Sequence, residues 1–139
     1  MQLTVGDWMK DLVVFVDPDS TVYDALTLMR HRYVNSLIVS KTETNPQYGI
    51  VTSIDVCDKI VAQKRNPRTT KVRDIMNAPL ITVPKDLDLS ECAAKMKENR
   101  IHHLPVVNEA GELVGMISAT DFLVVAEAFG NDFKDRSLT

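Results

Sequence analysis

Two short stretches of the chain combine a glycine, a hydroxyl side chain and a carboxylate at the same spacing. Residues 49–55 and 115–121 each read as a glycine, two apolar residues, a hydroxyl, two further residues and an aspartate. The hydroxyls of Thr52 and Ser118 suit the N-cap of a helix, and the acid three positions later completes a capping box. Each stretch, which we call the motif, is therefore predicted to be a short buried strand that leads directly into a helix.

The motif has the groups that a nucleotide site needs. The free N–H groups at a helix start favour phosphate or polar base edges, and a glycine lets another backbone or a flat ligand approach closely. A carboxylate there can accept hydrogen bonds from both ribose hydroxyls. A capping box needs no ligand, so a purely structural interpretation stays open for either copy alone. Two copies in 139 residues favour the ligand interpretation.

The motif belongs to a longer internal repeat. Val5 matches Val72, an offset of 72 − 5 = 67 residues, while the motif glycines are 115 − 49 = 66 residues apart. The first copy thus has one extra residue, which we place in the polar loop 41–47. A long period that occurs twice indicates two copies of one supersecondary unit. We divide the chain into a first repeat, 1–66, and a second repeat, 67–139.

Each repeat is predicted to contain an extended segment, a helix, a strand, a second strand and a closing helix. Thr21 and Asp88 are the expected N-caps of the first helices, and Pro105 is expected at an edge or at a non-hydrogen-bonded position. The fold class is α+β, a mixed α/β protein in which two β-α-β-β-α units pack by a pseudo-twofold axis. The helical period places the following residues toward the core: Val22, Ala25, Leu26, Met29, Tyr33, Val56, Ile60, Val61, Leu89, Cys92, Ala93, Met96, Phe122, Val125, Ala126 and Phe129.

The composition is that of an ordinary globular domain, with 45% apolar and 25% charged residues. The net charge of −3 provides no general attraction to nucleic acid. The basic connector 64–73 is interpreted first as a solvated linker, with contact to phosphate or nucleic acid as the alternative. No apolar run approaches the length of a membrane span and the start of the chain does not resemble a signal peptide, so we expect a cytoplasmic protein. Cys57 and Cys92 are expected to be reduced core residues.

The chain resembles the cystathionine-beta-synthase (CBS) domain family, as a free-standing tandem pair. The resemblance rests on Asp-Ile-Met at 74–76, on Ile-His-His-Leu-Pro-Val-Val at 101–107 and on the presence of the motif in both repeats. It implies a regulatory ligand-sensing pair with two clefts between the repeats, which commonly hold AMP, ADP, ATP or S-adenosylmethionine. It also implies a homodimer that acts on an effector protein, here unknown, and that has no catalytic activity of its own.

Site residues follow from the resemblance position by position. Asp121 and Asp55 resemble the acceptors of the ribose hydroxyls. His102 and His103 match positions that can contact phosphate, although one of two strand neighbours could instead point into the core. The remaining predicted ligand contacts are Ser118, Thr120 and Thr52 for ribose or phosphate, and Ile81, Thr82, Val83, Pro84, Val14, Phe15 and Val16 for adenine.

The first repeat departs from this pattern. Asn35 and Ser36 replace the two histidines, and Ile54 replaces Thr120. Because the first repeat has fewer polar and cationic groups, we expect the Asp121 cleft to bind more tightly than the Asp55 cleft. A structural or oligomerisation module with empty clefts is the alternative function. An enzyme is not expected, because the sequence has no nucleophile-and-base set, no phosphate-binding glycine loop and no cluster of metal ligands.

Overall fold

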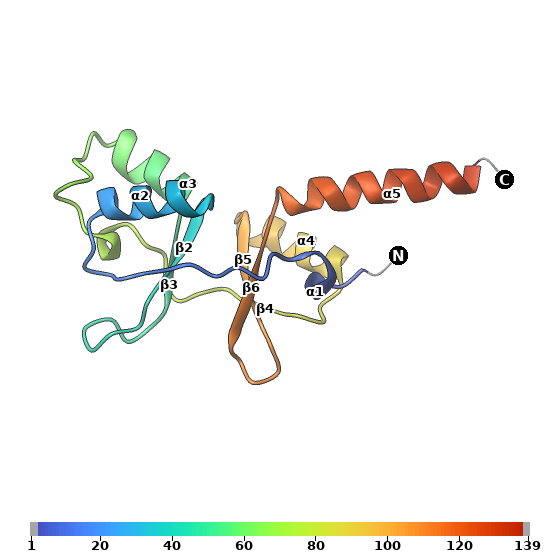
Figure 1. Cartoon of the computed structure of the whole chain (residues 1–139), viewed down its shortest axis with the longest axis horizontal. Coiled ribbons are helices and arrows are strands. Elements are labelled where there is room, and N and C mark those ends of the chain that lie inside the picture. The colour runs from blue at the N-terminus through green and yellow to red at the C-terminus, as the bar shows by residue number, and fades with distance from the viewer. Residues whose placement is uncertain (1–2, 138–139) are drawn as a thin grey trace. The chain divides into compact units, whose positions relative to one another are not determined.

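The computed structural model describes the backbone of residues 3–137 and the side chains of residues 3–131. The described chain forms two compact units. One unit is Val13–Leu80, and the other joins the segment that ends at Leu12 to the residues from Ile81 onward. Each unit contains a three-stranded sheet with helices beside it (Figure 1).

The Val13–Leu80 unit has the predicted order of elements. Its sheet has the order β1-β2-β3, with β1 parallel and β3 antiparallel to β2. A π-helical turn and a 3₁₀ turn follow the last strand and its short helix. The elements are β1 (Phe15–Val16), α2 (Val22–Arg32), β2 (Ser36–Val39), β3 (Gly49–Thr52), α3 (Ser53–Val56), the π-helix Cys57–Val61 and the 3₁₀ helix Val72–Asp74.

The other unit repeats this order. Its sheet has the order β4-β5-β6, again with one parallel and one antiparallel pair. Both units therefore confirm the β-α-β-β-α order and the mixed α/β class. The elements are α1 (Val5–Trp8), β4 (Val83–Pro84), α4 (Leu89–Asn99), β5 (His103–Val107), β6 (Leu113–Ser118) and α5 (Asp121–Ser137).

The compact units are offset from the sequence repeats. The segment that precedes the first repeat's strands joins the second repeat's sheet, because Lys10 and Met116 exchange backbone hydrogen bonds of 3.0 and 2.9 Å. The corresponding segment of the second repeat joins the first repeat's sheet, where Asn77 and Ile50 exchange two bonds of 2.9 Å. Lys10 and Asn77 are equivalent in the repeat, since 77 − 10 = 67. Each leading segment therefore packs on the other repeat's sheet.

The first helices begin where the sequence predicts. The Thr21 hydroxyl accepts a 3.1 Å hydrogen bond from the Asp24 amide at the start of α2. At the start of α4, Asp88 accepts bonds from the hydroxyl and the amide of Ser90, which hold the pKa of Asp88 below its usual value. Both capping predictions are confirmed, and both helices present an apolar side to their own sheet.

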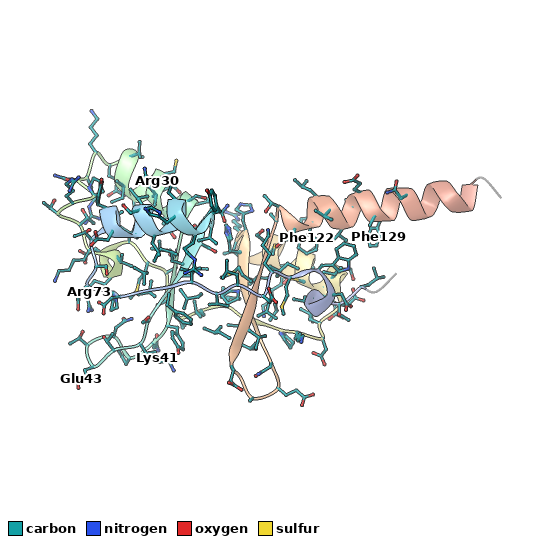
Figure 2. All side chains as sticks on the ribbon, viewed as in Figure 1. Arg30, Lys41, Glu43, Arg73, Phe122 and Phe129 are labelled. Atoms are coloured by element: carbon teal, nitrogen blue, oxygen red, sulfur yellow. The ribbon has the colours of Figure 1, made fainter. Side chains whose placement is uncertain are left out.

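Each unit has its own hydrophobic core, made of the buried sides of the strands and helices. In the second unit Phe122 and Phe129 lie on one side of α5 and pack onto that core (Figure 2). The buried residues of the two cores are Val14, Val16, Val22, Ala25, Met29, Leu37, Val39, Val51, Ile60, Val72 and Ile75 in the first, and Val5, Val83, Leu89, Cys92, Met96, Leu104, Val106, Ile117 and Val125 in the second.

Several predicted core residues are exposed instead. Tyr33 is 95% exposed, because α2 has already ended there and its backbone is left-handed. Val61 is 69% exposed and Cys57 is also exposed, because a π-helical turn does not keep the 3.6-residue period. Ala93 and Ala126 are exposed at the margins of otherwise buried helix faces. These predictions were wrong, because a periodic pattern does not show where a regular helix ends.

Pro105 lies in the central strand β5, so an edge position is wrong. It pairs with Met116, whose N–H and C=O both bond to Lys10 on the opposite side. The Pro105–Met116 pair is therefore a non-hydrogen-bonded pair, and the second predicted alternative is confirmed.

Replacing Tyr33 with glycine is expected to raise the free energy of unfolding by about 1 kcal/mol, because the left-handed conformation strains residues that have a Cβ. The φ angle of Tyr33 is 54°, and its exposed side chain has little packing to lose. Urea denaturation measures the change. Tyr33→Ala is the control, since it removes the ring and keeps the strain. Equal stabilities of the two variants would contradict this account.

The two free thiols are expected to react very differently with iodoacetamide. Cys92 is fully buried and burial raises its pKa to about 11, whereas Cys57 is exposed. Since the thiolate is the reactive form, native protein at pH 8 should take one label per chain, and denatured protein should take two. Mass spectrometry counts the labels, and rapid native labelling of Cys92 would show that the α4 side of the core opens.

Candidate functional site

The motif carboxylate of the first repeat is buried and fully engaged. Asp55 is 5% exposed, and its Oδ2 accepts bonds from the backbone N–H of Thr52 at 2.9 Å and from the Thr52 hydroxyl at 3.4 Å. Its Oδ1 accepts from Asn77 Nδ2 at 2.8 Å and pairs with Lys59 Nζ at 3.1 Å. One oxygen therefore caps the helix, and the other is held by an amide and an ammonium group.

The motif carboxylate of the second repeat has the same cap and a different counterion. Asp121 is 8% exposed, and its Oδ2 accepts from the N–H of Ser118 at 2.8 Å and from the Ser118 hydroxyl at 3.2 Å. Its Oδ1 accepts a 2.8 Å bond from Lys10 Nζ, and the Lys10 side chain is 68% exposed. The Ser118 and Thr120 hydroxyls are 2.8 Å apart. Among the contacts of the described residues, the partner of Oδ1 is therefore one largely exposed ammonium group.

The two helix starts differ in detail. Thr52 is the N-cap of α3 and Asp55 is its third residue, as predicted. α5 begins at Asp121, two residues later than a Ser118 cap would place it, although Asp121 still bonds the Ser118 amide. The capping-box contact is confirmed in both copies, and only the helix boundary shifts.

The motif glycines are explained by a backbone that passes close to them. A Cβ on Gly115 would lie 2.6 Å from Met9 Sδ and 2.7 Å from the Lys10 carbonyl oxygen. A Cβ on Gly49 would lie 2.8 Å from the sulfur of Met76, the residue equivalent to Met9. The sequence predicts that either another backbone or a flat ligand approaches these glycines closely. In the structure, another segment of the chain's own backbone does so. These glycines are therefore no evidence for a ligand.

The structure brings the predicted polar contacts of each repeat to one end of its sheet. His103 pairs with Ser118 across β5 and β6, next to Thr120 and Asp121. In the first repeat Ser36 occupies the place of His103 and pairs with Thr52. The end of the second sheet therefore has a histidine where the first has a serine.

His102 points away from the core. It is exposed and lines a pocket of about 420 Å³ together with Lys97 and Arg100. Apolar side chains from α4 and from the start of α5, among them Met96 and Phe122, line the same pocket. His103 is half-buried, so neither histidine is fully buried. Three basic side chains gather here on an apolar surface.

The predicted adenine-binding segments alternate between core and surface. Val14, Val16 and Val83 are buried, whereas Phe15, Ile81 and Pro84 are exposed and Thr82 is half-buried. The backbone of the first segment is tied down, since the Ile38 amide donates to the Val14 carbonyl at 2.9 Å.

The second segment lacks this bond. Pro105 takes the place of Ile38 in the repeat, and proline has no N–H to donate to the Ile81 carbonyl. The second repeat therefore has the less constrained of the two segments, although Lys95 Nζ bonds the Thr82 carbonyl at 2.9 Å.

Sequence reasoning missed the partners of the two acids. Lys10, Lys59 and Asn77 are not among the predicted site residues, although each contacts a motif carboxylate. One signal was present, because Lys10 and Asn77 occupy equivalent positions in a repeat and both follow a methionine. Lys59 gave no such signal, since Val125 is its equivalent in the second repeat.

Between residues 3 and 137, none of the helices is both long enough and apolar enough to span a bilayer. Among the described side chains, no three or more His, Cys, Asp or Glu residues gather as metal ligands would.

The chain is similar to known proteins over most of its length. The family model "CBS domain" matches twice, at residues 5–62 and 72–127. The CBS domain-containing protein CBSX3, mitochondrial, of Arabidopsis thaliana is 37% identical over 84% of this chain, which spans 55% of that protein.

Solved structures of CBS proteins have the same fold as this chain. The hexameric CBS-CP12 protein from bloom-forming cyanobacteria is 33% identical, has a TM-score of 0.81, and is matched over 88% of this chain and 70% of its own. The CBS domain pair of protein MJ0100, solved with 5-methylthioadenosine and S-adenosyl-L-methionine, has a TM-score of 0.75 at 23% identity, over 94% of this chain and 99% of its own. With two matches to the family model, one for each repeat, this chain belongs to the CBS domain family and carries its domains as a tandem pair.

Proposed function

We propose that this chain is a regulatory module that senses an adenosine derivative, AMP, ADP, ATP or S-adenosylmethionine, bound at the Asp121 motif. Its partners are then an adenine nucleotide, a second copy of the chain and an effector protein, and it has no catalytic role. A ligand can change the state read by an effector only if it binds the alternative states with different affinity. The proposal assigns ligand recognition to the second repeat.

The state of Asp121 is the observation that carries this proposal. Its Oδ2 accepts from the Ser118 amide, and among the contacts of the described residues its Oδ1 accepts from the ammonium group of the exposed Lys10. A lysine on a long exposed side chain can turn aside at little cost. A ribose diol can then donate to Oδ1, and the released ammonium group can bind phosphate.

The comparisons support the proposal at the level of the fold. A pair of the same fold, that of protein MJ0100, was solved with two adenosine compounds. The cationic pocket beside His102 adds a source of positive charge in the same unit as Asp121. The first supports an adenosine compound and the second an anionic group on it, and neither selects one compound over another.

A thermal-shift screen of AMP, ADP, ATP and S-adenosylmethionine tests the proposal. A bound ligand at one hundred times its dissociation constant stabilises the folded protein by about 2.7 kcal/mol. Asp121→Asn keeps an oxygen for the helix cap and loses the charge, so it should weaken binding by about ten-fold or more. Asp88→Asn, an equal charge change at the N-cap of α4, is the matched control. No shift with any compound would contradict the proposal.

A structural module is the second candidate, because both motif acids already have partners within their own unit. Leu123 and Val124 on α5 are 70% and 57% exposed, which leaves apolar surface for another subunit. Native mass spectrometry of the purified protein separates the two functions, since it detects a carried-over ligand and the oligomeric state together. An oligomer without any adenosine compound, and with no thermal shift, would favour the structural function.

A further inference from the structure

The two motif carboxylates differ at one position of the repeat that no motif includes. Lys59 lies four residues after Asp55, and the residue four positions after Asp121 is Val125. Val125 is 3% exposed and belongs to the core of its unit. Lys59 instead sends its ammonium group back to Asp55 Oδ1, at 3.1 Å.

Lys59 is part of a closed network. Its ammonium group also donates to the Ile75 carbonyl at 2.8 Å and to Asn77 Oδ1 at 3.3 Å. Asn77 in turn donates from Nδ2 to Asp55 Oδ1 at 2.8 Å. The Lys59 side chain is 32% exposed, less than half the exposure of Lys10. A ligand hydroxyl that approaches Asp55 Oδ1 must therefore displace two donors that also hold each other.

The Asp121 side has no such network among the contacts described. Lys10 takes the place of Asn77 in the repeat and makes one hydrogen bond to the acid. A phosphate group can accept a charge-assisted hydrogen bond from an ammonium group, as a carboxylate does. The phosphate of a bound nucleotide can therefore replace Asp121 as the partner of Lys10. Lys59 has no equivalent freedom, because its ammonium group is tied to a backbone carbonyl as well.

We infer that Lys59 closes the first repeat's carboxylate to ligands, so that the chain has a single adenosine site, at Asp121. This inference rests on the proposed function. It assigns Lys59 as a specificity-determining residue that never touches the ligand, and Asp55 as a structural acid in spite of its complete motif. Exchanging the counterion arrangement should open the second site.

The test replaces the residues that bind the first repeat's carboxylate with their equivalents from the second repeat. The double variant Lys59→Val, Asn77→Lys reproduces Val125 and Lys10, and it keeps one positive charge for Asp55. Calorimetric titration of the full chain with AMP, ATP and S-adenosylmethionine should give one site per chain in the wild type and two in this variant. Asn77→Lys alone is the matched control, since Lys59 stays, and it should keep one site.

The outcomes separate the inference from the proposed function. Two sites in the wild type, or no added site in a folded double variant, would overturn the inference even if Asp121 binds a nucleotide. No site in the wild type and one in the variant would overturn the function proposed for Asp121 and uphold the role of Lys59. No binding by either protein would overturn both.

If the double variant does not fold, Lys59→Met replaces it under the same criterion. Failure of both variants to fold would make Lys59 purely structural and overturn the inference.

Discussion

The variant Asp55→Ala is expected to lower the free energy of unfolding by about 3–5 kcal/mol, the cost of removing one partner from a buried ion pair. The change removes an acceptor from the Asn77 amide and the Thr52 N–H, and it removes the negative charge beside Lys59. The Lys59 ammonium group then keeps neutral acceptors, the Ile75 carbonyl and Asn77 Oδ1. Asp55 is 5% exposed, so water cannot easily replace it. Urea denaturation with an unchanged m-value measures the loss.

The equivalent change in the second repeat is the natural comparison. Asp121→Ala should cost about 1–2 kcal/mol, because it removes a helix cap and releases Lys10 into water at little cost. Asp55→Asn keeps an acceptor for Thr52 and should recover part of the loss. Equal losses in the two alanine variants would contradict the difference between the two acids, in which Asp55 Oδ1 is held by an amide and an ammonium group and Asp121 Oδ1 by the exposed Lys10.

Replacing Gly115 with alanine is expected to cost about 3 kcal/mol, at the upper end of ordinary overpacking. The new Cβ would lie 2.7 Å from the Lys10 carbonyl oxygen, which belongs to backbone and cannot turn aside. Relief of this contact requires the two Lys10–Met116 backbone bonds to lengthen or break. The N-terminal segment would then loosen from β6, and Lys10 would move away from Asp121. Urea denaturation and protease cleavage after Lys10 measure the two effects.

Two other glycines provide the controls. Gly49→Ala should be milder, since its Cβ would lie 3.1 Å from the nearest backbone oxygen, that of Asn77. Gly130→Ala, within α5 and with no atom near its Cβ, should stabilise the protein by about 0.5–1 kcal/mol. A Gly115→Ala variant as stable as the wild type would mean that the segment is not held against β6 as described.

The repeat, the order of elements and the helix caps could all be predicted from the sequence. Thr21 and Asp88 cap their helices, and the motif acids bond the amides three residues before them. These features depend on contacts between residues two to four positions apart. Such contacts are set by local residue types, so a pattern in the sequence is enough to predict them.

The ends of regular elements could not be predicted in this way. Tyr33 and Val61 continue the apolar pattern of their helices in the sequence, but both are exposed. Tyr33 is the left-handed residue that ends α2, and Val61 lies in a π-helical turn. Helix periodicity only predicts burial while the helix stays regular. The departures depend on how the whole segment packs, which no short window of sequence contains.

The residue pattern alone predicts a duplicated β-α-β-β-α unit with an acid at the start of each closing helix. The partners of those acids depend instead on how distant segments of the folded chain meet. The pair Lys10–Asp121 joins residues 111 positions apart, and Asn77 reaches Asp55 because each leading segment packs on the other repeat's sheet. Contacts of this range follow from how distant segments share one core, so two nearly identical motifs acquire different counterions and different freedom to bind a ligand.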